Sequence, residues 1–202
     1  LKESKSIALV SDAGMPGICD PGENIARAVK LEGLDVICIP GPCAALTALT
    51  SSGMPSSSFI FEGFLPKKKI EREKVLSEIS QNEKTTIIFE SPHRLKNLLR
   101  ELLNYCGGDR EIEIARELTK KFEEHIGTDI NDAIKSFEEK EVKGEITIVI
   151  KGIVKSKGKD LMESELKKEL KELLHAGLSL SSASKYLAKK TGHKKNTIYN
   201  LM

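Results

Sequence analysis

The order of apolar and polar positions predicts alternating strands and helices over the first 152 residues. Short apolar runs bounded by turn residues are typical of buried strands, and apolar residues repeated every three or four positions are typical of amphipathic helices. We expect strands at 7–10, 36–39, 59–61, 85–89, 111–115 and 144–150. We expect helices at 23–32, 43–50, 70–81, 95–105 and 130–139. Residues 116–125 alternate in charge, as at the start of a solvated helix.

The pattern becomes purely helical beyond a lysine-rich linker at 156–159. Helices are expected at about 161–175, 181–190 and 194–202, separated by tight turns at 176–179 and 191–193. Short helices joined by such turns indicate a bundle of the helix-turn-helix kind.

This alternation indicates an α/β protein, with a small helical bundle at its end. Each of the first two strands runs into a Gly- and Pro-rich turn, at 11–22 and 40–42, and then into a helix. Such units predict parallel neighbouring strands whose turns emerge at one edge of the sheet, where open α/β sheets bind ligands. The small polar break after Pro55 suggests a first domain over 1–55, a second over 56–152 with a mixed sheet, and a helical tail over 153–202.

Charge is spread unevenly along the chain. The net charge is only +2, but residues 153–202 carry eleven lysines against five acidic residues. Such a basic tail favours a polyanionic partner, most commonly a nucleic acid. The four cysteines show no C-x-x-C spacing, so we expect neither a metal site nor a disulfide framework. No apolar run is long enough to span a membrane, and we expect a cytoplasmic protein.

Two motifs resemble those of a known family. The segments Asp12–Gly17 and Asp20–Gly22, followed by Pro40–Ala45, are similar to the tetrapyrrole-methylase superfamily of S-adenosylmethionine (SAM) enzymes. They are most similar to its ribosomal RNA branch, which methylates the ribose 2′-oxygen of a cytidine in small-subunit rRNA. The resemblance implies a two-domain fold, with SAM between the domains, and a homodimer. Compact residues at 15, 19 and 43 replace the more usual Thr, Ser and Ser.

The resemblance also implies candidate site residues, because the turns at 90–94 and 115–120 match family motifs as well. Expected cofactor-binding residues are Ser11, Asp12, Ala13, Gly14, Ile18, Cys43, Ala44, Glu90 and Leu118. A ribose hydroxyl is a very weak acid, so a nearby base or cation would assist catalysis. The catalytic candidates are Glu90, His93, Arg116, Glu117 and Lys120. Candidate RNA contacts are Lys67, Lys68, Lys69, Arg94, Lys185, Lys189, Lys190, Lys194 and Lys195.

Two alternatives stay open at this point. The first is a corrin or porphyrinogen methyltransferase of the same superfamily, although the basic tail has no evident role with such an acceptor. The second is a non-catalytic nucleic-acid-binding module. The chain has no initiator Met and reaches its first expected strand after six residues, which indicates a fragment that begins inside a domain. The family's first cofactor loop would then be missing, so we expect weak SAM binding and low activity from this chain alone.

Overall fold

The computed structural model describes residue 1, residues 5–154 and residues 163–201. The described residues form two compact units, Leu1–Ile153 and Val154–Met202. The predicted linker at 156–159 lies outside the described residues. The helices are α1 (Glu23–Leu31), α2 (Ala44–Ser52), α3 (Lys69–Gln81), α4 (Pro92–Cys106), α5 (Ile130–Phe137), α6 (Glu163–His175), α7 (Leu180–Thr191) and α8 (Lys195–Tyr199). The strands are β1 (Phe59–Phe64), β2 (Thr85–Glu90), β3 (Ile112–Arg116), β4 (Glu124–Ile126) and β5 (Ile146–Ile150).

One mixed sheet organises the first unit. Its strand order is β1-β2-β5-β3-β4. Strands β1 and β2 run parallel, whereas β5 is antiparallel to both of its neighbours, β2 and β3. The mixed sheet expected after residue 56 is therefore confirmed. Because β1 and β2 are parallel, the residues that follow them emerge at the same edge of the sheet.

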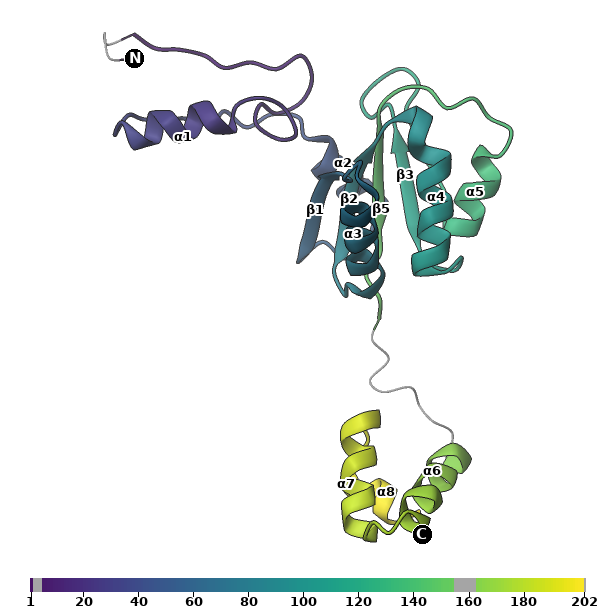
Figure 1. The fold of residues 1–202 in the computed structure, drawn as a ribbon. Coiled ribbons are helices and arrows are strands. Elements are labelled where there is room, and N and C mark those ends of the chain that lie inside the picture. The colour runs from purple at the N-terminus through teal and green to yellow at the C-terminus, as the bar shows by residue number, and fades with distance from the viewer. Residues whose placement is uncertain (2–4, 155–162, 202) are drawn as a thin grey trace. The chain divides into compact units, whose positions relative to one another are not determined.

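Helices cover both faces of this sheet. Helices α3, α4 and α5 lie together over one face (Figure 1), where their apolar side chains form the larger core with β2, β3 and β5. Helix α2 packs on the opposite face, with Ala45, Ala48 and Leu49 against Ile87 and Val149. A strand between two helical layers is buried on both sides, which explains why β2 and β5 are buried along almost their whole length and are rich in isoleucine.

The strands expected at 7–10 and 36–39 are wrong. Both segments are irregular, and neither pairs with another strand among the described residues. Their apolar side chains are largely open to solvent, with Val10 and Ile37 about four-fifths exposed (80% and 81%). A strand exists through hydrogen bonds to a neighbour, so an apolar run that meets no partner strand stays irregular.

The helix considered at 116–125 is also absent. The chain instead leaves β3 in a tight turn over 117–123 and returns antiparallel as β4. Glu117 and Thr119 have positive φ values, 52° and 65°, which no residue inside a right-handed helix adopts.

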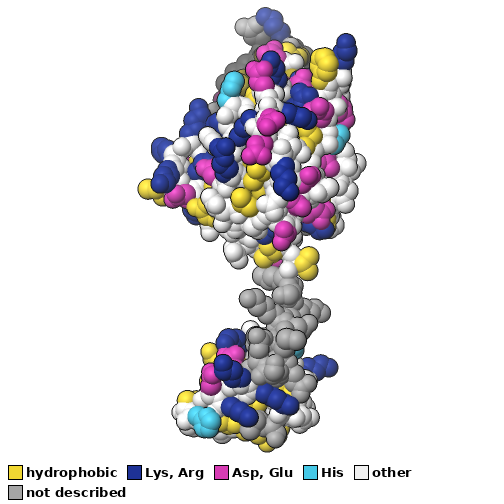
Figure 2. Space-filling view, turned by 90° about the vertical axis from the view of Figure 1, so that its right-hand side faces the viewer, with side chains coloured by type: hydrophobic (Ala, Val, Ile, Leu, Met, Phe, Trp, Pro, Cys, Tyr) yellow, Lys and Arg dark blue, Asp and Glu magenta, His cyan; other side chains and the backbone are white. Residues whose placement is uncertain are grey.

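The second unit contains the three helices that the sequence predicted. Leu170, Ala183, Leu187 and Ile198 form its small core. The Ser179 hydroxyl caps α7 by accepting a hydrogen bond from the Ser182 amide, which satisfies a free donor at the helix start. Figure 2 shows acidic and basic side chains intermixed on the visible face of the first unit. None of the helices over the described residues is long and apolar enough to cross a membrane.

Candidate functional site

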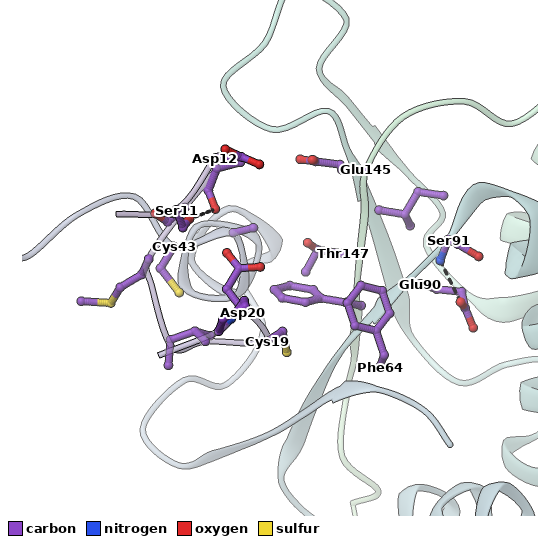
Figure 3. Close-up of a pocket in the computed structure, with 18 of the residues that line it drawn as sticks. Ser11, Asp12, Cys19, Asp20, Cys43, Phe64, Glu90, Ser91, Glu145 and Thr147 are labelled. Atoms are coloured by element: carbon purple, nitrogen blue, oxygen red, sulfur yellow. Dashed lines mark hydrogen bonds between the residues drawn. The ribbon is translucent and has the colours of Figure 1, made fainter. Parts of the chain in front are cut away.

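A cavity of about 690 Å³ lies at the carboxyl ends of β1 and β2, beneath the turn at 11–22. Figure 3 shows the turn on one side and the sheet on the other. The start of α2 and the residues preceding and beginning β5 complete its wall. Its lining residues are Leu9–Met15, Ile18–Pro21, Cys43, Ala44, Phe64, Phe89–Pro92 and Gly144–Thr147. The 11–22 turn and the two residues that follow the 40–42 turn, Cys43 and Ala44, therefore border one cavity, although the strands expected before the turns do not form.

Close backbone approaches place the 11–22 turn over the sheet. A Cβ atom at Gly63 would lie 2.8 Å from the Cys19 sulfur, so only glycine lets the turn come this near to β1. The Gly14 backbone faces the second turn. A Cβ atom built on Gly14 would lie 3.7 Å from the Pro42 carbonyl oxygen. Inside the turn, the Ser11 hydroxyl donates to the Ala13 carbonyl at 2.8 Å. Small residues at these points leave the backbone itself exposed to a ligand.

Aromatic rings form part of the cavity wall. Phe64 and Phe89 lie edge to face with their centroids 5.7 Å apart, and Phe89 meets Phe61 in the same way at 5.0 Å. Such pairs are stabilising beyond the area that they bury. Phe64 is nonetheless 51% exposed, so its ring is held in place while one side stays open.

The charge of the cavity wall is one-sided. Four carboxylates line it, from Asp12, Asp20, Glu90 and Glu145, and none of the described lining residues is basic. In Figure 3, Asp12 and Asp20 project from the turn towards the side of the cavity that carries Glu145 and Thr147. A cavity of this kind attracts cations and repels anions, with more force than a surface patch because the surrounding protein has a low dielectric constant.

Three of the catalytic candidates form a clasp at the rim of the cavity. The Arg116 guanidinium donates to the Lys143 carbonyl at 3.0 Å and pairs with Glu124 at 2.9 Å. The Glu117 carboxylate accepts from the Glu145 amide at 2.8 Å and from the Lys120 ammonium at 2.9 Å. These contacts tie the β3–β4 turn to the segment that enters β5.

The clasp leaves these side chains poorly suited to proton transfer. The hydrogen bond from the Glu145 amide, together with Lys120, lowers the pKa of Glu117. The carboxylates of Glu117 and Glu145 raise the pKa of Lys120, which keeps its ammonium protonated. The cavity lining also excludes all three clasp residues at 116, 117 and 120. Their contacts connect the β3–β4 turn to the segment that enters β5.

His125 makes further contacts to the same β3–β4 turn. His125 Nδ1 lies 2.8 Å from a Glu113 carboxylate oxygen, and Nε2 lies 3.0 Å from Glu123. The other Glu123 oxygen accepts from the Thr119 amide at 2.6 Å. Hydrogen bonding to Glu113, and then to Glu123, raises the pKa of His125 because both partners favour the charged ring.

The two remaining catalytic candidates differ in burial. Glu90 lies in the cavity wall, but its side chain is only 1% exposed and pairs with Arg94. His93 is exposed in the first turn of α4 and does not line the cavity. Ser91 begins the helix, followed by proline at the first helical position, where its missing N–H is harmless.

Most of the predicted cofactor residues come together at this cavity. Eight of the nine line it; the exception is Leu118, which packs against the core beneath α2. Sequence reasoning did not select Asp20, Phe64, Glu145 or Thr147, which also line it. Asp20 belongs to the same Asp-Pro-Gly motif and carried a usable signal, whereas Glu145 and Thr147 become neighbours of the turn only through the antiparallel placement of β5.

The candidate RNA contacts lie in three places, of which one is Arg94 in the first turn of α4. Lys67, Lys68 and Lys69 are exposed at the start of α3, and the last two pair with Glu71 and Glu73. The second group is exposed on and after α7; it comprises Lys185, Lys189, Lys190, Lys194 and Lys195. Of these, Lys190 pairs with Glu169, and Lys195 donates to Ser181. No group of metal-binding side chains occurs among the residues described by the structure.

Comparison with characterised proteins identifies the group to which the sequence is related. The profile of the family "Tetrapyrrole (Corrin/Porphyrin) Methylases" matches residues 1–134. A protein of Synechocystis named ribosomal RNA small subunit methyltransferase I is 40% identical over the whole chain, which covers 72% of that relative. A protein of the same name from Thermotoga maritima is 47% identical over 75% of the chain and 68% of the relative. A third, from Escherichia coli O157:H7, is 40% identical over 98% of the chain and 69% of the relative.

Solved structures show the same fold. The cobalamin-biosynthetic enzyme cobalt precorrin-4 methyltransferase superimposes with a TM-score of 0.52 at 17% identity, over 68% of this chain and 61% of that one. The methyltransferase CobJ gives a TM-score of 0.53 at 20% identity, over 69% and 62%. Identity this low supports the fold alone, whereas the sequence relatives confirm the resemblance read from the motifs. The chain belongs to the tetrapyrrole methylase family of SAM-dependent methyltransferases, with the relatives named ribosomal RNA small subunit methyltransferase I.

Proposed function

We propose that the cavity at the ends of β1 and β2 binds SAM and that the protein transfers its methyl group to small-subunit rRNA. The observation that carries this proposal is the one-sided charge of the cavity wall: the carboxylates of Asp12, Asp20 and Glu145 line it, and none of the described lining residues is basic. SAM bears two positive groups, the sulfonium and the ammonium, against one carboxylate. The cavity volume of about 690 Å³ also falls within the usual range for small-molecule sites.

The small residues of the two turns suit this ligand. Ala13, Gly14 and Ala44 allow a compact molecule to reach the backbone, and the Phe64 ring offers an apolar surface opposite them. When bound, SAM supplies an electrophilic methyl carbon whose transfer converts the sulfonium into a neutral thioether. The chain's own contribution is to hold the reactants in line and to exclude water, which is a large part of catalysis in such displacements.

We further propose that the acceptor is the ribose 2′-hydroxyl of a cytidine. This hydroxyl must lose a proton as the new C–O bond forms, and a positioned carboxylate can accept it. Asp12 and Asp20 reach the cavity from the turn, and Figure 3 shows no basic group beside them among the side chains drawn. They meet this requirement better than His93, which does not line the cavity, and better than Glu117 and Glu145, whose carboxylates both pair with Lys120.

The helical unit is proposed to attract the RNA. The segment from residue 173 to residue 202 contains five lysines and no acidic residue. Figure 2 shows basic side chains on the visible face of this unit. Lysines near phosphates release bound counterions and give strong, salt-dependent but sequence-independent affinity. Selection of the acceptor would then fall to the cavity and its rim.

The same charges disfavour the first alternative. Porphyrinogens and corrins carry several carboxylate groups, which the carboxylates of Asp12, Asp20 and Glu145 would repel, and a basic tail has no role with such a small acceptor. The second alternative, a non-catalytic binding module, predicts that nothing occupies the cavity. Relatives that share about 40% identity and a methyltransferase name support the catalytic reading.

The deciding experiment is methyl incorporation from labelled SAM into undermethylated small ribosomal subunits, followed by mapping of the modified nucleotide. Label is expected at one ribose of a cytidine. A mutant with the substitution Ala44→Leu, which fills the cavity, serves as the inactive control. Label on a base, or transfer to a porphyrinogen and none to ribosomal subunits, would contradict the proposal.

We also propose that the protein acts as a homodimer in the cytoplasm, where ribosomal subunits are assembled. The exposed apolar side chains of the first unit support pairing: Leu31, Ile37 and Ile39 are each at least 78% exposed. Burial of such groups drives most protein association. Light scattering on the purified protein should give twice the mass of one chain, and a monomeric mass at micromolar concentration would refute this part.

A further inference from the structure

Glu90 is the one catalytic candidate that lies in the cavity wall, but its carboxylate is not available to a substrate. The side chain is 1% exposed, and its Oε2 atom is sealed from solvent without a hydrogen-bond partner among the described residues. In Figure 3 the carboxylate points away from Asp12 and Asp20 and towards Ser91. An acid or base in methyl transfer must reach the acceptor, so the position of this group argues against proton transfer.

Its Oε1 atom is already fully used. It accepts from the Ser91 amide at 2.7 Å and from Arg94 Nε at 2.7 Å, and Arg94 Nη2 lies at 2.7 Å as well. Arg94 Nε is also 3.1 Å from the Ser91 hydroxyl oxygen. A buried charge is tolerated when it is paired and hydrogen-bonded in this way.

A second ion pair, between Arg72 and Glu101, lies next to the pair of Glu90 and Arg94. Arg72 lies 3.6 Å from Glu90 Oε2, but its stronger contacts are to Glu101, at 2.9 Å from Nε and 2.7 Å from Nη2. Arg72 is only 13% exposed, so it stabilises Glu90 from inside the protein and does not face a ligand. The two carboxylates and two guanidinium groups balance in charge. Arg94 is the outer cation of this set, with its side chain 34% exposed.

The contacts of Arg94 fix the direction of its guanidinium. Glu90 occupies the edge formed by Nε and Nη2, which leaves the edge formed by Nη1 and Nη2 open. A planar guanidinium edge matches two oxygens of a phosphate, a geometry that lysine cannot reproduce. Arg94 also follows Pro92, a cavity-lining residue, by two positions in the first turn of α4. Arg94 is therefore close in sequence to the cavity wall but is not one of its lining residues, and it adds no positive charge to that lining.

These observations combine with the proposed function, on which this inference rests. A nucleotide whose ribose enters an acidic cavity must keep its phosphates away from those carboxylates. We infer that Glu90 is a positioning residue: it anchors Arg94 as a fixed cation at the cavity mouth, where Arg94 binds a phosphate of the RNA next to the acceptor ribose. Arg94 thus contacts the RNA, and Glu90 acts only through Arg94.

The test compares Glu90→Gln, Arg94→Lys and the double variant with the wild-type protein. The substrate is undermethylated small ribosomal subunits, and the readouts are kcat, KM for the subunits, the Kd for SAM and the pH profile of kcat. Each single variant should raise KM about tenfold with kcat within twofold, the size expected for one bidentate charged contact. The Kd for SAM and the pH profile should not change. The KM of the double variant should be no higher than the higher of the two single-variant values, because both substitutions remove the same interaction.

Glu101→Gln is the matched control. It breaks the other ion pair of the set, at Arg72, and should leave KM for the subunits unchanged. If Glu90→Gln proves too unstable to purify, Arg94→Lys and Arg94→Gln test the same contact, because Arg94 is the more exposed of the two partners. A fall in kcat of a hundredfold or more for Glu90→Gln at constant KM, with one limb of the pH profile abolished, would show that Glu90 is a base. An unchanged KM in Arg94→Lys would equally overturn the inference.

Failure of the proposed function gives a different result. In that case the wild-type protein itself transfers no methyl group to the subunits. Direct binding of rRNA to the wild-type protein, Arg94→Lys and Glu101→Gln still tests the phosphate contact. A tenfold loss of RNA affinity in Arg94→Lys alone supports the contact, and equal affinities for all three refute it.

Discussion

Gly144 should be the most sensitive position of the cavity rim to the addition of a single methyl group. It has a φ of +88°, and a Cβ atom built on it lies 2.5 Å from the Glu117 side chain. That side chain holds the clasp, through the Glu145 amide and the Lys120 ammonium. The substitution Gly144→Ala therefore strains the backbone and also displaces the Glu117 carboxylate.

The two costs can be separated. An alanine in the left-handed region is destabilised by about 1–2 kcal/mol. Loss of the two hydrogen bonds to Glu117 adds roughly 1–3 kcal/mol, at about 0.5–1.5 kcal/mol for each bond. Gly53 is the matched control, because its φ is +65° and a Cβ there meets nothing within 4 Å. Gly53→Ala should show the backbone cost alone.

Urea unfolding of both variants measures the difference in stability, and calorimetric titration measures SAM affinity. Gly144→Ala should be less stable than Gly53→Ala by roughly 1–3 kcal/mol, and its SAM affinity should fall about threefold to tenfold as the wall around Glu145 shifts. In a Glu117→Ala background the excess cost should disappear, because the clashing group is gone. Equal stabilities of the two glycine variants, together with unchanged SAM affinity, would refute the role assigned to the clasp.

Three further changes test other parts of the molecule. His125→Asn should remove about 0.5–1 kcal/mol of stability at pH 6 and little at pH 9. Because the pKa of His125 is raised in the folded protein, the histidine stabilises the fold fully below its ordinary pKa of 6.5 and less as the pH rises through its folded pKa. Thermal unfolding measured as a function of pH tests this. Ala44→Leu should weaken SAM binding more than tenfold in calorimetry while the unfolding temperature changes little, because the side chain fills the cavity from an exposed position. Replacing Lys185 and Lys189 together by Gln should make the plot of log K for RNA binding against log salt concentration less steep, by roughly 0.7 for each phosphate that the protein no longer neutralises. Lys190→Gln should change this slope less, because Lys190 is already paired with Glu169.

The sequence was most informative where burial imposes a strict pattern. The runs at 85–89 and 144–150 are rich in β-branched and apolar residues because helices cover both faces of β2 and β5, and the bounds of these strands were predicted closely. The start of α5 was also readable, since the Asp129 carboxylate accepts from the Asp132 amide as an N-cap. Local patterns of this kind depend on nearest neighbours along the chain.

The same reasoning failed where the outcome depends on distant partners. The run at 7–10 has the pattern of a strand, but an apolar pattern does not show whether a neighbouring strand will be present. Nor does it reveal that β5 lies between β2 and β3, which brings Glu145 to the cavity. The direction of the Glu90 carboxylate was not predictable for a related reason: its position at a strand end was predicted, but the direction depends on Arg94 and Arg72.

The distribution of charge explains why one chain can serve a cationic cofactor and a polyanionic substrate. A single basic surface reaching into the cavity would attract RNA phosphates to the place where SAM must bind. Here the carboxylates of the cavity lie in the first unit, whereas the lysines at 185–195 lie in the second, which has no acidic residue beyond position 172. Fields of opposite sign on separate units let each ligand be attracted without competition. In the phosphate contact that we propose, Arg94 is where the two requirements meet, because its pairing with a buried carboxylate keeps its charge out of the cavity lining.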